Sequence, residues 1–312
     1  MKKIFITGGA GFIGSHLARK LARDGHQVTV FDLNYANLCK LQGGNIRMIQ
    51  GDIRDKITLL NVMKGHDLVW HLAANTDIPN GHKDTRLDLE HCTIGTCNVL
   101  DAMVAHQIPD LLFASTAAVY GTGAAEQPAV ETMAPLRPIS LYAAGKLACE
   151  AFISGYCHLY GIRANMFRFG NVVGGGMDHG VIFDLIQKLR KNPKRLEVWG
   201  DGRGRKPFFL VEDCIRGMEI AYQHSVEMDS YLVPCEVYNL GTSTNSQIGW
   251  VAEQVVRIMG LDAEIVYTGN KQGFPGDVPV VRYDAGRMNA LGWQPSGTSD
   301  EAVLIAIDRL LR

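Results

Sequence analysis

The 312-residue chain lacks several features that would place it in a specialised class of protein. No apolar run approaches the roughly 20 residues that a membrane-spanning helix needs. A formal net charge of −1 without a basic run argues against a nucleic-acid-binding surface. The seven cysteines form no C-x-x-C pair and the histidines do not cluster at metal-ligand spacing, which predicts reduced thiols and no metal site. We therefore expect a cytoplasmic globular protein with no membrane or nucleic-acid partner.

A cluster of glycines lies near the start of the chain. Residues 4–7, a β-branched and aromatic run, predict a buried strand, and the spacing G-x-x-G-x-x-G follows it directly. Apolar residues then repeat every four positions up to Gly25, which predicts an amphipathic helix ending in glycine. Such a turn lets the backbone approach a pyrophosphate, which the free N–H groups of the helix N-terminus face. The cofactor-binding residues expected in this turn are Gly8, Gly11, Phe12, Ile13 and Gly14.

An acidic residue at the end of the second predicted strand indicates which cofactor binds. Residues 28–31 form that strand, and Asp32 closes it about twenty positions after the glycine turn. A carboxylate at this place accepts hydrogen bonds from both ribose hydroxyls and repels a 2′-phosphate. The sequence therefore predicts NAD rather than NADP.

Strand and helix patterns alternate through the first half of the chain. Further strands are predicted at residues 46–50, 68–72, 111–114 and 163–169, with long helices at about 88–106 and 140–160. The alternation predicts an α/β fold, a Rossmann doubly wound parallel sheet with a smaller C-terminal substrate-binding lobe. We expect residues 1–170 to form the NAD-binding domain, which also receives a strand near 237–240. Residues 171–312 are expected to form mainly the substrate-binding lobe, interleaved with the first.

A tyrosine and a lysine share one face of the second long helix. Tyr142 and Lys146 are spaced i, i+4. An ammonium group near a phenol favours the phenolate and lowers a pKa that starts near ~10, so the pair predicts a base that works at neutral pH. Ser115 and Thr116 end a neighbouring predicted strand and add a hydroxyl group. The alternative is a tyrosine that only packs and a lysine that lies in solvent.

Several motifs together carry a resemblance to a known family. They are residues 7–14, 51–53, 71–74, 115–121, 142–146, 168–171, 275–277 and 291–293. With these motifs the chain resembles the extended short-chain dehydrogenase/reductases of the NAD-dependent nucleotide-sugar epimerase/dehydratase branch, of the UDP-glucose 4-epimerase type. The resemblance extends over most of the sequence.

The resemblance implies roles for the residues that match. On the cofactor side, Asp52 and Ile53 would contact the adenine, and Ala73 and Ala74 would line the cofactor. Lys146 would hold the nicotinamide ribose, with Tyr142 beside it. Thr116 would hydrogen-bond the sugar's 4-OH next to Tyr142, so that the expected catalytic residues are Thr116, Tyr142 and Lys146. The expected substrate-binding residues are Thr116, Asn171, Val181, Trp199 and Lys206, of which Asn171 and Lys206 would hold the diphosphate.

The residues after Thr116 favour one reaction of the family. The family's 4,6-dehydratases carry an Asp-Glu pair there for the additional proton transfers, whereas this chain has Ala117 and Ala118. A 4-epimerase needs only the Tyr/Thr pair and NAD. We therefore expect epimerisation at C4 of a UDP-hexose through a transient 4-keto intermediate, with Tyr142 as the base. The first alternative is a nucleotide-sugar dehydratase, decarboxylase or reductase of the same family. The second alternative is a non-catalytic NAD-binding regulatory protein.

The chain also departs from the family pattern. Cys92 replaces an asparagine that usually precedes the Gly-Thr pair, and Lys206 replaces a diphosphate-clamping arginine, which keeps the charge but loses the bidentate fork. The resemblance also implies a homodimer through the two long helices. Leu147, Ile153 and Tyr156 could make that contact or could pack inward.

Overall fold

The computed structural model describes residues 1–41, 43–75, 81, 83–228, 234–269 and 272–312. The chain forms two compact units, and each is built from three segments. The first unit comprises Met1–Thr116, Leu141–Arg168 and Met218–Tyr238. The second unit comprises Ala117–Ser140, Phe169–Gly217 and Asn239–Arg312.

The main sheet has seven strands in the order β11-β6-β5-β4-β1-β2-β3. The strands are β1 (Lys3–Thr7), β2 (Gln27–Asp32), β3 (Ile46–Gln50), β4 (Leu68–His71), β5 (Asp110–Thr116), β6 (Arg163–Phe169) and β11 (Cys235–Leu240). β1 pairs in parallel with β2 on one side and with β4 on the other, so that Ile6 lies between Val30 and Trp70. β2–β3 and β4–β5 are also parallel. The predicted Rossmann fold class is confirmed, and the strand order reverses between β1 and β4, where ligands bind in such sheets.

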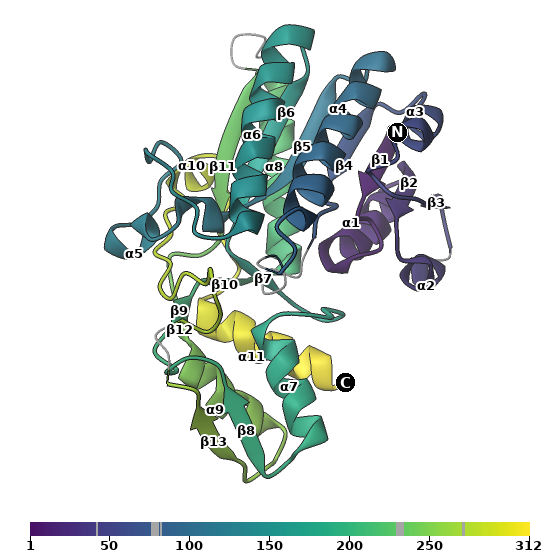
Figure 1. The fold of residues 1–312 in the computed structure, drawn as a ribbon. Coiled ribbons are helices and arrows are strands. Elements are labelled where there is room, and N and C mark those ends of the chain that lie inside the picture. The colour runs from purple at the N-terminus through teal and green to yellow at the C-terminus, as the bar shows by residue number, and fades with distance from the viewer. Residues whose placement is uncertain (42, 76–80, 82, 229–233, 270–271) are drawn as a thin grey trace. The chain divides into compact units, whose positions relative to one another are not determined.

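Helices cover this sheet because their apolar residues recur at helical spacing. In the first unit these helices are α1 (Phe12–Arg23), α2 (Tyr35–Leu38), α3 (Lys56–Val62), α4 (Gly95–Ala105) and α6 (Leu141–Tyr160), with a 3-10 turn at Cys39–Leu41 and a π-helix at Leu89–Ile94. α8 (Val211–Glu227) runs from the second unit into the first. α4 and α6 lie side by side (Figure 1). Residues of α3, α4 and α6 pack with β1, β4 and β5 in one core.

The second unit contains three small two-stranded sheets. β7 (Asn171–Val173) pairs with β10 (Phe208–Leu210), β9 (Arg205–Lys206) with β12 (Ser246–Gln247), and β8 (Arg195–Val198) with β13 (Glu264–Tyr267). Its helices are η4 (Ala117–Tyr120), α5 (Gly123–Glu126), α7 (Val181–Lys191), α9 (Ile248–Ile258), α10 (Gly286–Ala290) and α11 (Ser299–Leu311). α11 begins with a capping box in which Thr298 and Glu301 satisfy each other's backbone N–H groups.

Of the two possibilities that the sequence left open for the apolar residues of α6, inward packing holds for Ile153. Ile153 is fully buried in the core, and the Tyr156 hydroxyl donates to Asp101 Oδ1 at 2.6 Å. Phe152 and Leu159 are exposed instead, by 47% and 75%. Any partner that covers α6 would therefore contact Phe152 and Leu159 rather than Ile153.

The described part of the chain has no helix that is both long and apolar enough to span a bilayer. Among the same residues, no group of three or more His, Cys, Asp or Glu side chains is placed to hold a metal ion. All seven cysteines are free thiols.

Candidate active site

The turn between β1 and α1 can be built only with glycine at two positions. Gly8 has a φ of +66°, and a Cβ there would lie 2.6 Å from the backbone nitrogen of Ala73. A Cβ on Gly14 would lie 2.3 Å from the carbonyl oxygen of Gly8. The Gly11 N–H donates to the same oxygen at 3.2 Å, and Phe12 and Ile13 begin α1. The turn therefore brings bare backbone and a helix N-terminus together, and this cradle fits a pyrophosphate.

Asp32 lies directly beside this turn. Its Oδ2 accepts a hydrogen bond from the Ala10 N–H at 2.9 Å, and its Oδ1 accepts one from the Asn34 N–H at 2.9 Å. The carboxylate is thereby fixed at the end of β2, next to the strand that carries the glycines. This is the position from which an acidic residue reaches a ribose.

The other predicted cofactor residues follow β3 and β4. Asp52 forms an ion pair with Arg54 at 2.6 Å. Burial alone would raise the pKa of Asp52, but the hydrogen bonds and the charge of Arg54 outweigh burial and hold it below its usual value. Ile53 is buried against Gly95, where a Cβ would lie 2.4 Å from its Cδ1. Ala73 and Ala74 are half-buried against the core of the first unit.

A buried chain of polar side chains links β1 to α6, and the sequence did not predict it. The His71 ring lies 2.6 Å from Thr7 Oγ1 through Nδ1 and 2.9 Å from Thr96 Oγ1 through Nε2. The Thr96 hydroxyl in turn donates to Cys149 Sγ at 3.2 Å. Burial, with a smaller effect of the Lys146 charge, lowers the pKa of His71 to about 3. His71 is therefore neutral and serves to hold β1, β4, α4 and α6 in register.

The protonation of His71 predicts how stability depends on pH. The unfolded chain takes up a proton on this side chain near pH 6.5, whereas the folded protein does so only near pH 3. Between these values the unfolded state binds more protons, so this residue makes the free energy of unfolding fall as the pH falls, by about 1.4 kcal/mol per pH unit. The free energy of unfolding, measured with urea at several pH values between 7 and 5, should fall less steeply with falling pH in His71→Asn than in the wild type. His158→Asn, at an exposed histidine, is the control. An equal dependence of the free energy of unfolding on pH in all three proteins would contradict the role given to His71.

The three predicted catalytic residues meet at the end of β5. The Thr116 side chain is hydrogen-bonded to the phenol of Tyr142. One helical turn further along α6, Lys146 is buried, and its Nζ donates to the carbonyl oxygen of Ala114 at 2.6 Å. The same ammonium group lies 4.7 Å from the centre of the Phe113 ring. The spacing of Tyr142 and Lys146 thus places both residues against one strand end, as the sequence predicted.

The direction of the Tyr142 pKa differs from the sequence expectation. Burial raises the pKa of this phenol well above its ordinary value, and the nearby Cys92 and Asp88 raise it further. The hydrogen bond from Thr116 lowers it but does not outweigh the other effects. The expectation that Lys146 lowers the pKa of the phenol is wrong for this structure, because burial and the neighbouring Cys92 and Asp88 determine the direction of the shift. Thr116 is the group that favours the phenolate here.

The predicted substrate residues all lie in the second unit, apart from Thr116. Asn171 begins β7, where its N–H donates to Pro207 O at 2.9 Å, and Val181 begins α7. Trp199 follows β8, is 49% exposed, and has Lys188 Nζ 4.7 Å from its ring centre. The four predicted residues of the second unit therefore come from four separate segments.

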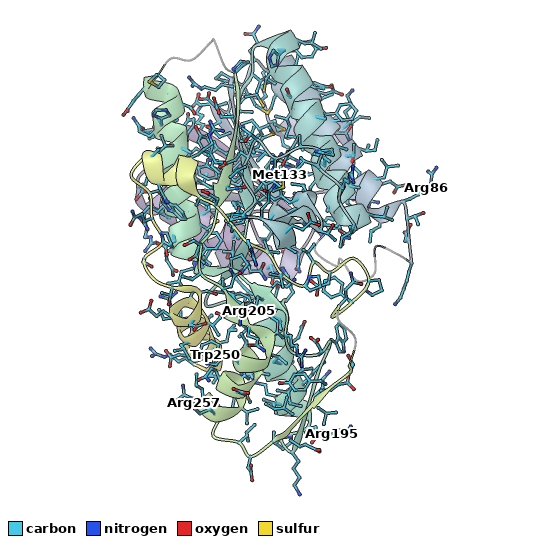
Figure 2. All side chains as sticks on the ribbon, turned by 90° about the vertical axis from the view of Figure 1, so that its left-hand side faces the viewer. Arg86, Met133, Arg195, Arg205, Trp250 and Arg257 are labelled. Carbon is cyan, nitrogen blue, oxygen red and sulfur yellow. The ribbon has the colours of Figure 1, made fainter. Side chains whose placement is uncertain are left out.

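The Lys206 ammonium group already has partners in the structure. Its Nζ forms an ion pair with Asp277 Oδ1 at 2.5 Å and also donates to the carbonyl of Val278. A diphosphate would have to compete with the Asp277 carboxylate for this charge. The neighbouring Arg205, labelled in Figure 2, is exposed and adds a second cation on β9.

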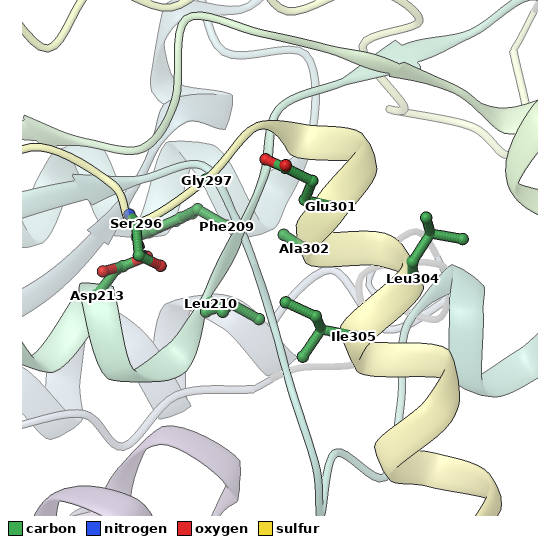
Figure 3. Close-up of a pocket in the computed structure, with 9 residues that line it drawn as sticks. All are labelled: Phe209, Leu210, Asp213, Ser296, Gly297, Glu301, Ala302, Leu304 and Ile305. Atoms are coloured by element: carbon green, nitrogen blue, oxygen red, sulfur yellow. Dashed lines mark hydrogen bonds between the residues drawn. The ribbon is translucent and has the colours of Figure 1, made fainter.

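A separate cavity of about 330 Å³ lies in the second unit and contains none of the predicted site residues. It is lined by Phe209, Leu210, Asp213, Ser296, Gly297, Glu301, Ala302, Leu304 and Ile305 (Figure 3). Its acidic groups already have partners, since Asp213 Oδ2 accepts from the Ser296 N–H and hydroxyl at 2.9 and 2.7 Å. Glu301 belongs to the capping box of α11. The cavity is therefore not the candidate active site.

A glycine cradle, an acidic residue on the next strand and a Tyr/Lys pair at a strand end define a dinucleotide-dependent enzyme of the extended short-chain dehydrogenase/reductase class. The chain belongs to the NAD dependent epimerase/dehydratase family, whose model matches residues 4–241. Its cofactor is NAD, as the sequence predicted.

Individual relatives cover nearly the whole chain. The putative UDP-glucose 4-epimerase of Methanocaldococcus jannaschii is 30% identical over 94% of this chain and 93% of its own length. A UDP-N-acetyl-alpha-D-glucosaminuronate decarboxylase of Bacillus cytotoxicus is 31% identical over 88% of this chain and 85% of its own. The crystal structure of UDP-glucose 4-epimerase from Thermus thermophilus in complex with NAD superimposes with a TM-score of 0.85, at 28% identity, over 98% of both chains.

Proposed function

We propose that this protein epimerises a nucleotide-activated sugar at C4, with a UDP-hexose as the favoured substrate. The observation that carries the proposal is the hydrogen bond between Thr116 and Tyr142 at the end of β5, with Lys146 one turn away on the same helix. With two hydroxyl groups held together in this way, Thr116 can hydrogen-bond a sugar hydroxyl while Tyr142 takes its proton. The name of the M. jannaschii relative agrees with this reaction.

The glycine cradle fits the cofactor, so the residues around it are proposed to hold NAD. Gly8, Gly11 and Gly14 would admit its pyrophosphate, and Asp32 would accept hydrogen bonds from a ribose. Phe12, Ile13, Asp52, Ile53, Ala73 and Ala74 would complete the cradle, with Tyr142 and Lys146 at its catalytic end. NAD, when bound, supplies a hydride acceptor for C4 of the sugar and the donor that returns the hydride.

The chain's own residues would carry out the proton transfers. Tyr142 takes the proton of the 4-OH through its phenolate and gives it back after the 4-ketose has turned over. Thr116 holds the sugar oxygen beside the phenol and favours the phenolate by its hydrogen bond. In the second unit, Asn171 and Lys206 would contact the diphosphate, and Val181 and Trp199 would lie around the base of the nucleotide. Lys206 would bind the diphosphate by exchanging the carboxylate of Asp277 for a phosphate.

The residues after Thr116 support epimerisation over dehydration. Ala117 and Ala118 occupy the first positions of η4, and neither can remove a C5 proton or protonate a leaving C6 hydroxyl. A decarboxylase is a second candidate, because the 31% identical B. cytotoxicus relative carries that name. Oxidation at C4 of a sugar with a C6 carboxylate gives a β-keto acid, which loses carbon dioxide without a further catalytic group.

A panel of sugar nucleotides tests the proposal. The purified protein is mixed with UDP-, GDP-, CDP- and dTDP-sugars, including uronic acids, and the products are identified. We expect inversion at C4 without net formation of NADH. Release of carbon dioxide would establish the decarboxylase instead, and a stable keto product would establish a dehydratase or oxidoreductase. No turnover of any sugar nucleotide despite bound NAD would overturn the enzymatic proposal in favour of a regulatory protein.

We also propose a homodimer in which α4 and α6 form the interface, with Phe152 and Leu159 of α6 at the contact. These large apolar side chains are exposed on a helix whose opposite face is buried. Sedimentation equilibrium decides the point, since a monomer at micromolar concentration would contradict it.

A further inference from the structure

Three polar residues of α6 contact the last three residues of β5. Tyr142 meets Thr116, Lys146 meets the carbonyl of Ala114, and Glu150 accepts a hydrogen bond from the hydroxyl of Ser115. The three helix residues are spaced four apart, so they form one stripe on the face of α6 toward the strand. The first two contacts belong to the candidate catalytic centre. The third lies one turn further along and has no role in the proposed reaction.

Glu150 is buried and both of its carboxylate oxygens have partners. Ser115 Oγ and Arg168 Nε, the latter at 3.0 Å, donate to Oε1, and Arg168 Nη2 donates to Oε2 at 2.7 Å. The side chains of Glu150 and Arg168 are only 6% and 5% exposed. A buried ion pair of this kind contributes little net stability, because desolvation offsets the attraction, but its geometry is narrowly defined. The network therefore fixes where β5 ends relative to α6 and β6.

We propose that Glu150, oriented by Arg168, is a positioning residue that holds Ser115 so that the adjoining Thr116 and Ala114 meet Tyr142 and Lys146. The proposal rests on the proposed function, since it assigns a purpose to the placement of the same catalytic pair. Ser115 is the link, because its neighbours on either side make the two catalytic contacts. Neither Glu150 nor Arg168 touches the substrate or NAD in this scheme.

A second ion pair, in which the carboxylate is buried and the guanidinium half-buried, offers a comparison at the other end of β5 and β6. Arg163, the first residue of β6, pairs with Asp110, the first residue of β5, at 2.6 Å. If the Glu150–Arg168 pair, which joins α6 to β6, served only stability, its neutralisation would change catalysis no more than neutralisation of the Asp110–Arg163 pair. If Glu150 positions the catalytic end, only its removal changes catalysis.

The mildest test is Ser115→Ala. Arg168 still satisfies both oxygens of Glu150, so the variant should fold. We expect kcat to fall about ten- to a hundredfold with little change in KM, since a misplacement of about 1 Å costs up to this much. The rising limb of kcat against pH should move to higher pH, because a misplaced Thr116 no longer lowers the pKa of Tyr142. Ser225→Ala, another buried serine of the first unit, should leave kcat and the limb unchanged.

The double variant Glu150→Gln/Arg168→Gln removes one ion pair, and Asp110→Asn/Arg163→Gln removes the Asp110–Arg163 pair together with the longer contact of Asp110 with Lys2. We expect the first to reproduce the kinetic effect of Ser115→Ala and the second to leave kcat unchanged, whatever either does to the melting temperature. Equal kcat values and equal pH dependence in Ser115→Ala and Ser225→Ala would overturn the positioning role of Glu150. Equal losses of kcat in the two double variants would overturn it as well.

Backbone hydrogen exchange separates this inference from the proposed function. The peptide that covers the end of β5 should exchange faster in Ser115→Ala than in the wild type and in Ser225→Ala. If even the wild type turns over no sugar nucleotide, the proposed function fails. Faster exchange at the end of β5 would then still support the role of Glu150, whereas unchanged exchange would refute it.

Discussion

Tyr142→Phe should lower kcat by about two to four orders of magnitude while NAD remains bound. The substitution removes one oxygen from a partly buried side chain and leaves the glycine cradle untouched. It deletes both the proposed base and the partner of the Thr116 hydroxyl. Because a positioned acid or base contributes about 10²–10⁴-fold, we expect a loss of that size in kcat. NAD content after acid release should stay close to that of the wild type.

The control for this variant lies on the same helix. Tyr156 is also partly buried, and its hydroxyl donates to Asp101 Oδ1 at 2.6 Å, away from the end of β5. Tyr156→Phe removes the same oxygen from the same kind of residue, so it should retain wild-type kcat. Full activity of Tyr142→Phe, or equal losses in the two variants, would refute Tyr142 as the base.

The pKa of Tyr142 sharpens the same prediction. Burial, Cys92 and Asp88 raise it, so the fraction of phenolate is small at neutral pH and grows as the pH rises. Wild-type kcat should therefore increase with pH on the alkaline side of neutrality. From the sequence alone we expected a lowered pKa for Tyr142, because the spacing of Tyr142 and Lys146 does not reveal which groups surround the phenol.

Local patterns predicted the cofactor cradle because its requirements are local. The turn from β1 to α1 depends on glycines within seven residues of one another, and their spacing can be read directly. Asp32 could be predicted in the same way, since it ends the next strand. In the structure the Asp32 carboxylate accepts a hydrogen bond from the Ala10 N–H, so this residue and the turn lie in direct contact.

Pairings between distant residues could not be read in the same way. His71 meets Thr96 across 25 positions, and Lys206 meets Asp277 across 71. Nothing in the sequence marked Glu150 beyond its helical spacing from Tyr142 and Lys146, since its partner Arg168 lies on β6, 18 positions further on. The stripe at positions 142, 146 and 150 is nevertheless a usable signal, because a charged residue that extends a catalytic stripe by one turn faces the same strand.

Gly14→Ala should impair both folding and cofactor binding, since this position has no room for a methyl group. A Cβ would lie 2.3 Å from Gly8 O and 2.6 Å from Gly9 Cα, and both are backbone atoms that cannot rotate away. The start of α1 would have to move from the end of β1. Overpacking of this kind costs about 1–3 kcal/mol of stability. The N–H groups that would hold the pyrophosphate move as well, and each 1.4 kcal/mol lost there weakens NAD binding about tenfold.

A second glycine-to-alanine change provides the comparison. Gly155 lies in the interior of α6, is exposed, and has no atom within 4 Å of a Cβ built on it. Gly155→Ala should stabilise the protein by about 0.8–1 kcal/mol through helix propensity and leave NAD affinity unchanged. Calorimetric titration with NAD and urea unfolding measure both quantities on the same preparations. The steric account requires opposite signs of the stability change in the two variants. NAD affinity in Gly14→Ala equal to that of the wild type would show that the helix N-terminus does not hold the pyrophosphate, because the clash must displace that end of α1 first.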